Sequence, residues 1–175
     1  MDIVDIIMTR RSIRKYTSQP VDETILQRLL QAAMAAPSAV NSQPWEFIVV
    51  TEKDMLAEMY RNLPYGRYDA PAAIIVCANP DIAENKGAAE RFWIQDCSAA
   101  TENILIAAAG LGLGTVWCAV HPNETREKAF REAFSIPAGA IPLNVILVGF
   151  PAEVKPPRTQ YKEERVHWQR YTAGK

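Results

Sequence analysis

The chain has 175 residues, of which 49% are hydrophobic and 22% are charged, and its formal net charge is −1. These values are ordinary for a globular domain and exclude a disordered or low-complexity chain. The near-zero net charge gives no general attraction to nucleic acid or to anionic lipid. Residues 1–10 lack the basic segment and the apolar run of a signal peptide, and no stretch reaches the roughly 20 apolar residues of a membrane helix. We therefore expect one soluble, cytoplasmic domain that binds neither nucleic acid nor membrane.

The cysteines and histidines form no recognisable metal or redox motif. Cys77, Cys97 and Cys118 include no CxxC pair, and each lies in an apolar stretch, which favours small buried hydrophobic side chains. His121 and His167 have no second ligand type at metal spacing. We expect no metal site.

The spacing of apolar residues predicts helices and strands that are mixed along the chain. The predicted helices cover residues 2–8, 22–35, 52–62, 89–109 and 123–134. The predicted strands cover residues 45–50, 72–78, 115–120 and 143–150. Helices dominate, there are about four strands, and no linker divides the chain, so the pattern predicts a single α+β domain.

Two segments indicate that the chain has a partner. Residues 97–109 are alanine-rich and apolar around nearly the whole helix, apart from Glu102 and Asn103. Such a helix is normally packed on several sides, and in a chain of this size we infer that a second subunit covers part of it. The tail, residues 151–175, is rich in proline and charge, yet it carries more large apolar side chains than a solvated tail needs. These are Tyr161, Val166, Trp168 and Tyr171. We expect the tail to wrap around the partner.

The glycine-rich segment 110–114 invites comparison with a dinucleotide-binding fingerprint. That fingerprint lies between a strand and the helix that follows it, whereas here an alanine-rich helix precedes the glycines and a strand follows them. We interpret the segment as the end of a helix and a tight turn, with Gly110 near the left-handed position.

A cluster of basic residues near the N-terminus has three interpretations. Arg10, Arg11, Arg14 and Lys15 surround Ser12. The cluster fits a solvated charged face, a short nucleic-acid patch, or a site for a phosphate-bearing cofactor, because arginine matches the geometry of a phosphate and serine adds a donor. Composition alone does not rank the three.

Several motifs together resemble the nitroreductase family, and they occur in that family's order over nearly the whole chain. They are RRSIRKYTSQPV, PSAVNSQPW, Asp69-Ala70-Pro71 before AAIIVCA, AAAGLGLGT running into Val116-Trp117, and LNVILVGFPAE. The resemblance implies an α+β, nitroreductase-like fold with a central, mostly antiparallel sheet of four to five strands surrounded by helices. It also implies a single FMN-binding domain over 1–175 in an intertwined homodimer, with 151–175 as the extension that wraps the partner subunit.

The same resemblance implies an FMN-dependent NAD(P)H:acceptor oxidoreductase. Hydride would pass through flavin N5, in a ping-pong cycle, to a nitroaromatic, a quinone or a similar electron-poor acceptor. The flavin carries this chemistry, so no side chain is expected to be catalytic. Different flavin chemistry on the same scaffold remains open, namely flavin cleavage, dehalogenation or dehydrogenation, as does a non-catalytic FMN-binding or redox-sensing module. A helical interaction protein would leave the co-occurrence of the motifs unexplained.

The resemblance assigns the basic cluster to the cofactor. Arg10, Arg11, Ser12 and Arg14 match the first FMN-binding motif of the family. Arg10 and Ser12 would contact the phosphate and the ribityl chain, and Arg14 would approach the N1/O2 edge of the ring. A fixed cation at that edge stabilises the negative charge of the reduced ring.

Two further segments complete the implied site. The loop with Pro37, Ser38, Ala39 and Asn41 matches the one that the second subunit supplies to the ring and the ribityl chain. In the strand that follows the glycines, side chains would line one face of the isoalloxazine, and two backbone N–H groups would donate to N5 and O4. The side chains are those of Trp117 and Cys118, and the N–H groups are those of Ala119 and Val120.

Basic residues elsewhere are additional candidates. Arg158 in the tail matches the residue that closes over the phosphate, and Lys155 is a second candidate for that task. Arg67 is a candidate for the ring edge, where larger relatives place a lysine.

Overall fold

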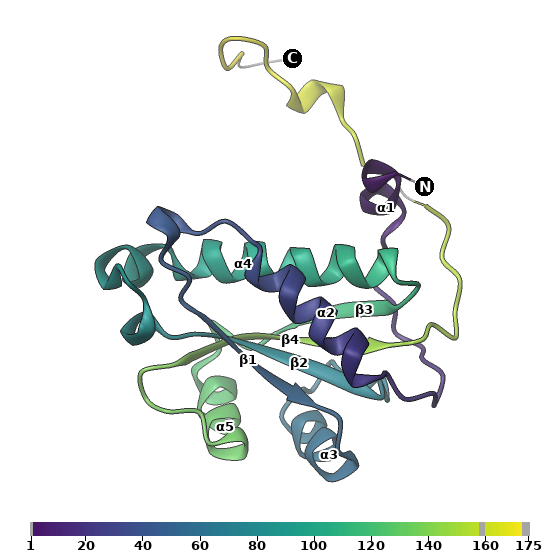
Figure 1. The fold of residues 1–175 in the computed structure, drawn as a ribbon. Coiled ribbons are helices and arrows are strands. Elements are labelled where there is room, and N and C mark those ends of the chain that lie inside the picture. Colours follow the sequence, from purple (N-terminus) through teal and green to yellow (C-terminus); the bar gives the residue numbers. More distant parts are fainter. Residues whose placement is uncertain (1, 158–159, 173–175) are drawn as a thin grey trace.

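The computed structural model describes residues 2–157 and 160–172, and it confirms the α+β class (Figure 1). The helices are α1 (Ile3–Thr9), α2 (Glu23–Met34), α3 (Lys53–Arg61), α4 (Lys86–Gly110) and α5 (Glu124–Phe134). The strands are β1 (Trp45–Val50), β2 (Ala72–Ala78), β3 (Gly114–Ala119) and β4 (Ile141–Gly149). Short 3-10 turns are η1 (Ala39–Asn41), η2 (Pro80–Ile82) and η3 (Glu163–Arg165).

The four strands form one antiparallel sheet in the order β1-β2-β4-β3. The two inner strands are buried almost along their whole length, because the sheet is covered on both faces. Ile75 of β2 lies between Ile48 of β1 and Val145 of β4. β3 is therefore an edge strand, and one side of its backbone is not paired with β4.

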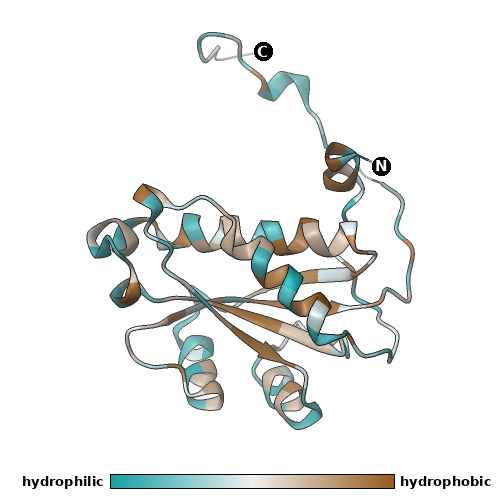
Figure 2. Cartoon of the chain, in the orientation of Figure 1, coloured by the Kyte–Doolittle hydropathy of each residue, from teal (hydrophilic) through white to brown (hydrophobic). Residues whose placement is uncertain are grey.

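Helices cover both faces of the sheet, α2 and α4 on one side and α3 and α5 on the other (Figure 1). The side chains of α4 that face the sheet include Cys97, Ala100 and Ala108, and their small size lets the helix lie close to the strands. Phe130 of α5 and Met59 of α3 fill the opposite face. Figure 2 shows the strands as the most hydrophobic part of this region.

α4 begins three residues before the predicted helix, because Asn85 caps it by accepting a hydrogen bond from Ala88 N–H at 3.0 Å. The glycine-rich segment does end this helix and turn into β3, as predicted. The left-handed residue is Gly112, with φ of +75°, and not Gly110, which is still helical. The predicted position of that turn was therefore wrong by two residues.

α1 and the tail differ from the rest of the chain. No residue of α1 is buried, and Ile3 and Ile7 remain exposed. The described part of the tail passes α1 and extends away from the sheet (Figure 1). Within the described part of the chain, no helix combines the length and the apolar character needed to cross a membrane.

Candidate active site

The basic segment lies against the free edge of β3. Ser12 forms a parallel bridge with Thr115, and Ile13 N–H donates to Thr115 C=O at 2.9 Å. The close approach requires a glycine in the strand, because a Cβ on Gly114 would lie 2.7 Å from Cγ2 of Ile13. The segment is thereby fixed to the sheet, and Arg10, Arg11, Ser12 and Arg14 line a cavity beside it.

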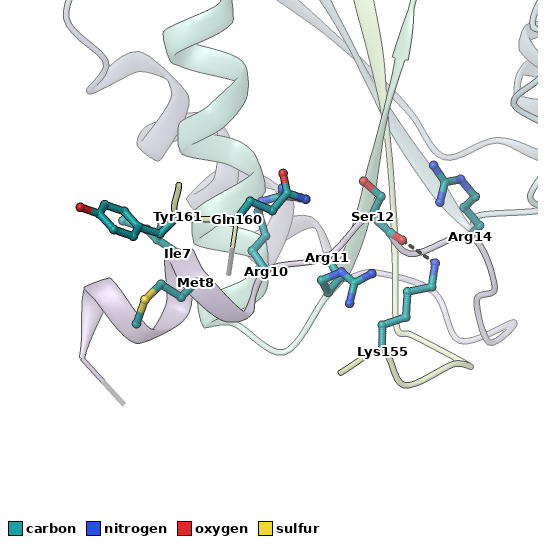
Figure 3. Close-up of a pocket in the computed structure, with 9 residues that line it drawn as sticks. All are labelled: Ile7, Met8, Arg10, Arg11, Ser12, Arg14, Lys155, Gln160 and Tyr161. Atoms are coloured by element: carbon teal, nitrogen blue, oxygen red, sulfur yellow. Dashed lines mark hydrogen bonds between the residues drawn. The ribbon is translucent and has the colours of Figure 1, made fainter. Parts of the chain in front are cut away.

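This cavity, which we call the basic pocket, has a volume of about 740 Å³ (Figure 3). Arg10, Arg11, Arg14 and Lys155 supply four cationic side chains, and no carboxylate is present among its described lining residues. The full lining is Ile7, Met8, Arg10, Arg11, Ser12, Arg14, Lys155, Gln160 and Tyr161. This set of donors suits a phosphate monoester.

Lys155 and Glu153 attach the start of the tail to the basic segment. The Lys155 ammonium donates to Ser12 C=O at 2.7 Å, drawn as the dashed line in Figure 3, and pairs with Glu153 at 3.1 Å. Glu153 also accepts a hydrogen bond from Arg14 N–H at 2.6 Å. That backbone bond, followed by the Lys155 ammonium, lowers the pKa of the Glu153 carboxyl.

The arginines of the basic pocket are held in different ways. Arg10 pairs with Glu102 of α4 at 3.6 Å, and Arg11 donates to a backbone carbonyl of the tail. The Arg14 guanidinium lies 5.9 Å from the centre of the Tyr68 ring. Among the described residues, no carboxylate lies within 4.0 Å of that guanidinium. Arg14 is therefore the cation most available to an incoming anion.

A second cavity of about 300 Å³ adjoins the basic pocket and shares Arg14 with it. We call it the aromatic pocket, because Tyr65, Tyr68 and Trp117 contribute to its walls. The full lining is Arg14, Leu63, Pro64, Tyr65, Gly66, Tyr68, Val116, Trp117, Cys118, Ala119 and Arg126. Flat aromatic walls next to a basic site suit a planar ring that carries a phosphorylated chain.

The sequence and the fold were compared with known proteins. Residues 7–65 and 57–150 match the Nitroreductase family. The chain is 46% identical, over 98% of its length and 88% of the relative's, to a Methanothermobacter thermautotrophicus protein with the provisional name NADH dehydrogenase/NAD(P)H nitroreductase. It is 26% identical to the FMN reductase [NAD(P)H] of Bacillus subtilis, over 96% of this chain and 73% of that one. An FMN-dependent nitroreductase structure from Clostridium difficile R20291 superposes with a TM-score of 0.85 at 30% identity, covering 96% of this chain and 99% of that one.

The chain belongs to the nitroreductase family. It is an oxidoreductase with the nitroreductase fold, as the sequence motifs implied.

The two backbone N–H groups expected to donate to the flavin face different sides of β3 in the single chain. Val120 N–H donates to Leu143 C=O of β4 at 3.0 Å, so in the single chain it faces β4, and its role as a flavin donor stays a prediction. Paired and unpaired residues alternate along an antiparallel ladder, so Ala119 faces the free edge. In agreement, Ala119 C=O accepts a hydrogen bond from Arg126 at 2.6 Å on that side. Ala119 N–H remains the candidate donor.

The side chains of Trp117 and Cys118 both line the aromatic pocket, but they leave the strand on opposite faces. The expectation that they line one face of the isoalloxazine stays a prediction. Trp117 is 36% exposed, whereas Cys118 packs with the core between the sheet, α3 and α5. Burial raises the pKa of the Cys118 thiol to about 11, so the thiol is protonated at neutral pH and is a poor nucleophile.

The loop of residues 37–41 lies away from both pockets. It is fixed beside the middle of α4, where Ala39 N–H donates to Asp96 at 2.9 Å. None of its predicted site residues lines either pocket; these are Pro37, Ser38, Ala39 and Asn41. A single chain thus brings together the first motif and β3, but not the loop.

The additional basic candidates have different positions. Lys155 lines the basic pocket, whereas Arg67 donates to Tyr60 C=O at 3.4 Å and is not among the described lining residues of the aromatic pocket. The expectation for Arg158 concerns a residue outside the described part of the chain.

Among the lining residues of the aromatic pocket that were not predicted, three have large polar side chains, Tyr65, Tyr68 and Arg126. Tyr65 and Tyr68 lie in a loop whose composition carries no specific signal. Arg126 did carry a signal in the sequence. It is a cation in the first turn of α5, where the helix dipole favours an acid. Across the residues that the structure describes, no group of three or more His, Cys, Asp or Glu side chains is arranged to hold a metal ion.

Proposed function

We propose that this nitroreductase is an FMN-dependent NAD(P)H:acceptor oxidoreductase that works by a ping-pong cycle. When bound, FMN supplies a hydride acceptor and donor at N5, so that NAD(P)H and an electron-poor acceptor, such as a nitroaromatic or a quinone, react in turn. The observation that carries the proposal is the pair of adjoining pockets that meet at Arg14, one basic and one aromatic. The FMN reductase and the FMN-dependent nitroreductase named above support it.

The basic pocket fits the phosphate and the ribityl chain. In our proposal Arg10, Arg11 and Ser12 bind the phosphate end, and Lys155 adds a fourth positive charge to the pocket. Arg158 would close over the phosphate from the tail. Charge-assisted hydrogen bonds are the strong ones in such a site, so these residues account for most of the cofactor affinity.

The aromatic pocket fits the ring. Arg14 has its charge available where the two pockets meet, and a fixed cation there stabilises negative charge on the reduced ring. Ala119 N–H, on the free edge of β3, offers a backbone donor to the ring edge. Trp117 and Cys118 would limit the pocket from the two sides of the strand and exclude water from it.

We further propose that the enzyme is a homodimer whose subunits complete each other's sites. Apolar side chains on α1 and in the tail are exposed in the single chain, among them Ile3 and Trp168. In the dimer, the segment 151–175 would wrap the partner, and the loop with Pro37, Ser38, Ala39 and Asn41 would enter the partner's cofactor site. This arrangement accounts for the separation of that loop from the pockets of its own chain.

A visible absorption spectrum of the purified protein tests the cofactor. We expect the flavin bands and, after denaturation, a released chromophore with the mass of FMN. Mixing with NADH or NADPH should bleach the bands, and adding a nitroaromatic or a quinone should restore them. Protein that is colourless and is not stabilised by added FMN would contradict the proposal, as would flavin that neither nicotinamide reduces.

A further inference from the structure

The loop beside α4 has an unusual backbone. Val40, Asn41 and Gln43 have φ values of +46°, +56° and +46°, so three non-glycine residues within four positions adopt the left-handed region. Valine is the most unexpected of them, since a β-branched side chain makes this conformation costly. Such strain persists only where the surroundings impose it.

Asp96 imposes this conformation from within the core. Its side chain is only 4% exposed, and its two oxygens accept hydrogen bonds from both ends of the turn. Oδ1 accepts from Ala39 N–H at 2.9 Å, and Oδ2 accepts from the Ser42 hydroxyl at 3.1 Å. A further bond from Gln43 N–H to Ser38 Oγ, at 3.0 Å, closes the loop. Bonds to a carboxylate are strong enough to offset local strain.

The strained residue does not serve the packing of its own chain. The Val40 side chain is 70% exposed, so its left-handed backbone is not the result of burying it. The strain instead fixes the shape that the loop presents outward. Strained backbone of this kind gathers at binding sites, where a fixed shape avoids the entropy cost of ordering a loop on binding.

We propose that Asp96 is a positioning residue that holds the strained loop of residues 38–43 in its ligand-binding shape. The inference rests on the proposed function, in which this loop enters the FMN site of the partner subunit. Asp96 touches neither cofactor nor substrate, and it acts through Ala39 and Ser42. Loosening the clamp should therefore weaken FMN binding by letting the loop leave the strained conformation.

The first test replaces the carboxylate by an amide of nearly the same volume. In Asp96→Asn we expect the dissociation constant for FMN to rise about tenfold, the loss expected when charge-assisted bonds become neutral ones. Ser42→Ala, which removes one of the two bonds, should raise it about threefold to tenfold. Glu90→Gln, an exposed carboxylate on the same helix, is the matched control and should leave the constant unchanged.

Hydrogen exchange on the cofactor-free protein tests the clamp itself. Amides of residues 38–43 should exchange at least tenfold faster in Asp96→Asn than in the wild type, with no comparable change in β2. Because this measurement needs no FMN, it separates the inference from the proposed function. Wild-type protein that fails to bind FMN contradicts the function, whereas equal exchange in the two proteins contradicts the clamp.

A second substitution distinguishes positioning from a general loss of structure. Glycine adopts the left-handed region without strain, so Val40→Gly placed in the Asp96→Asn background should recover about threefold of the lost FMN affinity. A variant that was merely misfolded would not be rescued. FMN affinity that is unchanged in Asp96→Asn, or that is not recovered by Val40→Gly, overturns the inference.

Discussion

The sheet with its helices and the α1–tail region differ in how far they bury their apolar side chains. Ile74 and Ile146 lie in the middle of the sheet with no exposed surface, covered by helices of the same chain. Trp168 and Tyr171, in the tail, are 77% and 84% exposed. One region therefore buries its apolar side chains within the chain, while the other presents them outward. On the proposed function, stability comes from the sheet, and assembly comes from α1 and the tail.

The largest effect is expected where this contrast is sharpest, in the sheet. Ile146→Ala removes a fully buried side chain of the inner strand β4 and should lower the free energy of unfolding by about 2–5 kcal/mol. Urea unfolding measures it. Val154→Ala, at a side chain that is 99% exposed, should change it by less than about 0.5 kcal/mol. Similar losses for the two variants would remove the distinction between the regions.

The converse experiment addresses the tail. If Trp168 and Tyr171 pack against a partner, replacing both by alanine should weaken the dimer by about 2 kcal/mol or more, which is roughly 30-fold. Sedimentation equilibrium would show this as a larger dissociation constant. The unfolding of the isolated chain should change little, because neither side chain contacts the sheet core. A dimer as stable as the wild type would show that these side chains have another role.

Arg14 lies where the two regions meet, because its N–H donates to Glu153 at the start of the tail while the neighbouring Ile13 is bonded to the sheet. Arg14→Ala should weaken FMN binding by about 1.5–3 kcal/mol and slow reduction of the flavin by NADH, because a charge-assisted contact is lost. Fluorescence titration and stopped-flow absorbance give the two values. Lys15→Ala, at an exposed neighbour outside the described lining of both pockets, is the control. An unchanged FMN affinity in Arg14→Ala would mean that the pocket is wrongly assigned.

The smallest effect is a pH dependence at the attachment of the tail. The pKa of the Glu153 carboxyl is lower in the folded chain than in the unfolded one. The ionised carboxylate therefore stabilises the fold above the unfolded pKa, and this stabilisation is lost as pH falls through the folded pKa. Glu153→Gln should therefore be less stable than the wild type near pH 7. The two proteins should become equal in strongly acidic solution. Thermal unfolding at a series of pH values measures the difference, and a difference independent of pH would exclude this carboxylate as its cause.

Much of the fold could be predicted from the sequence, and the reasons are local. β1 and β2 have the predicted bounds, because each is an apolar run that follows a proline, Pro44 or Pro71. Arg10, Arg11, Ser12 and Arg14, which the sequence places in one motif, also line one cavity, while their role toward FMN stays a prediction. The opposite directions of Trp117 and Cys118 follow from strand alternation and could have been predicted as well.

Other features depend on pairings that one sequence does not reveal. The Val120 N–H is engaged because of its register with Leu143, on a strand much later in the chain. Asp96 looks like any acid in a long helix until the fold brings Ala39 to it, 57 residues away in the sequence. On the proposed function, the loop of residues 37–41 is harder still, because the site that it enters belongs to the partner subunit.

The free edge of β3 has a consequence for the purity and storage of the protein. An unpaired strand edge is a template for another chain, and proteins usually cover it. Here Ser12 and Ile13 cover one end at Thr115, while the backbone from Trp117 to Ala119 opens into the aromatic pocket. On the proposed function, the cofactor shields this remaining stretch. Preparations stripped of flavin should then aggregate through β3, and added FMN should keep them in solution.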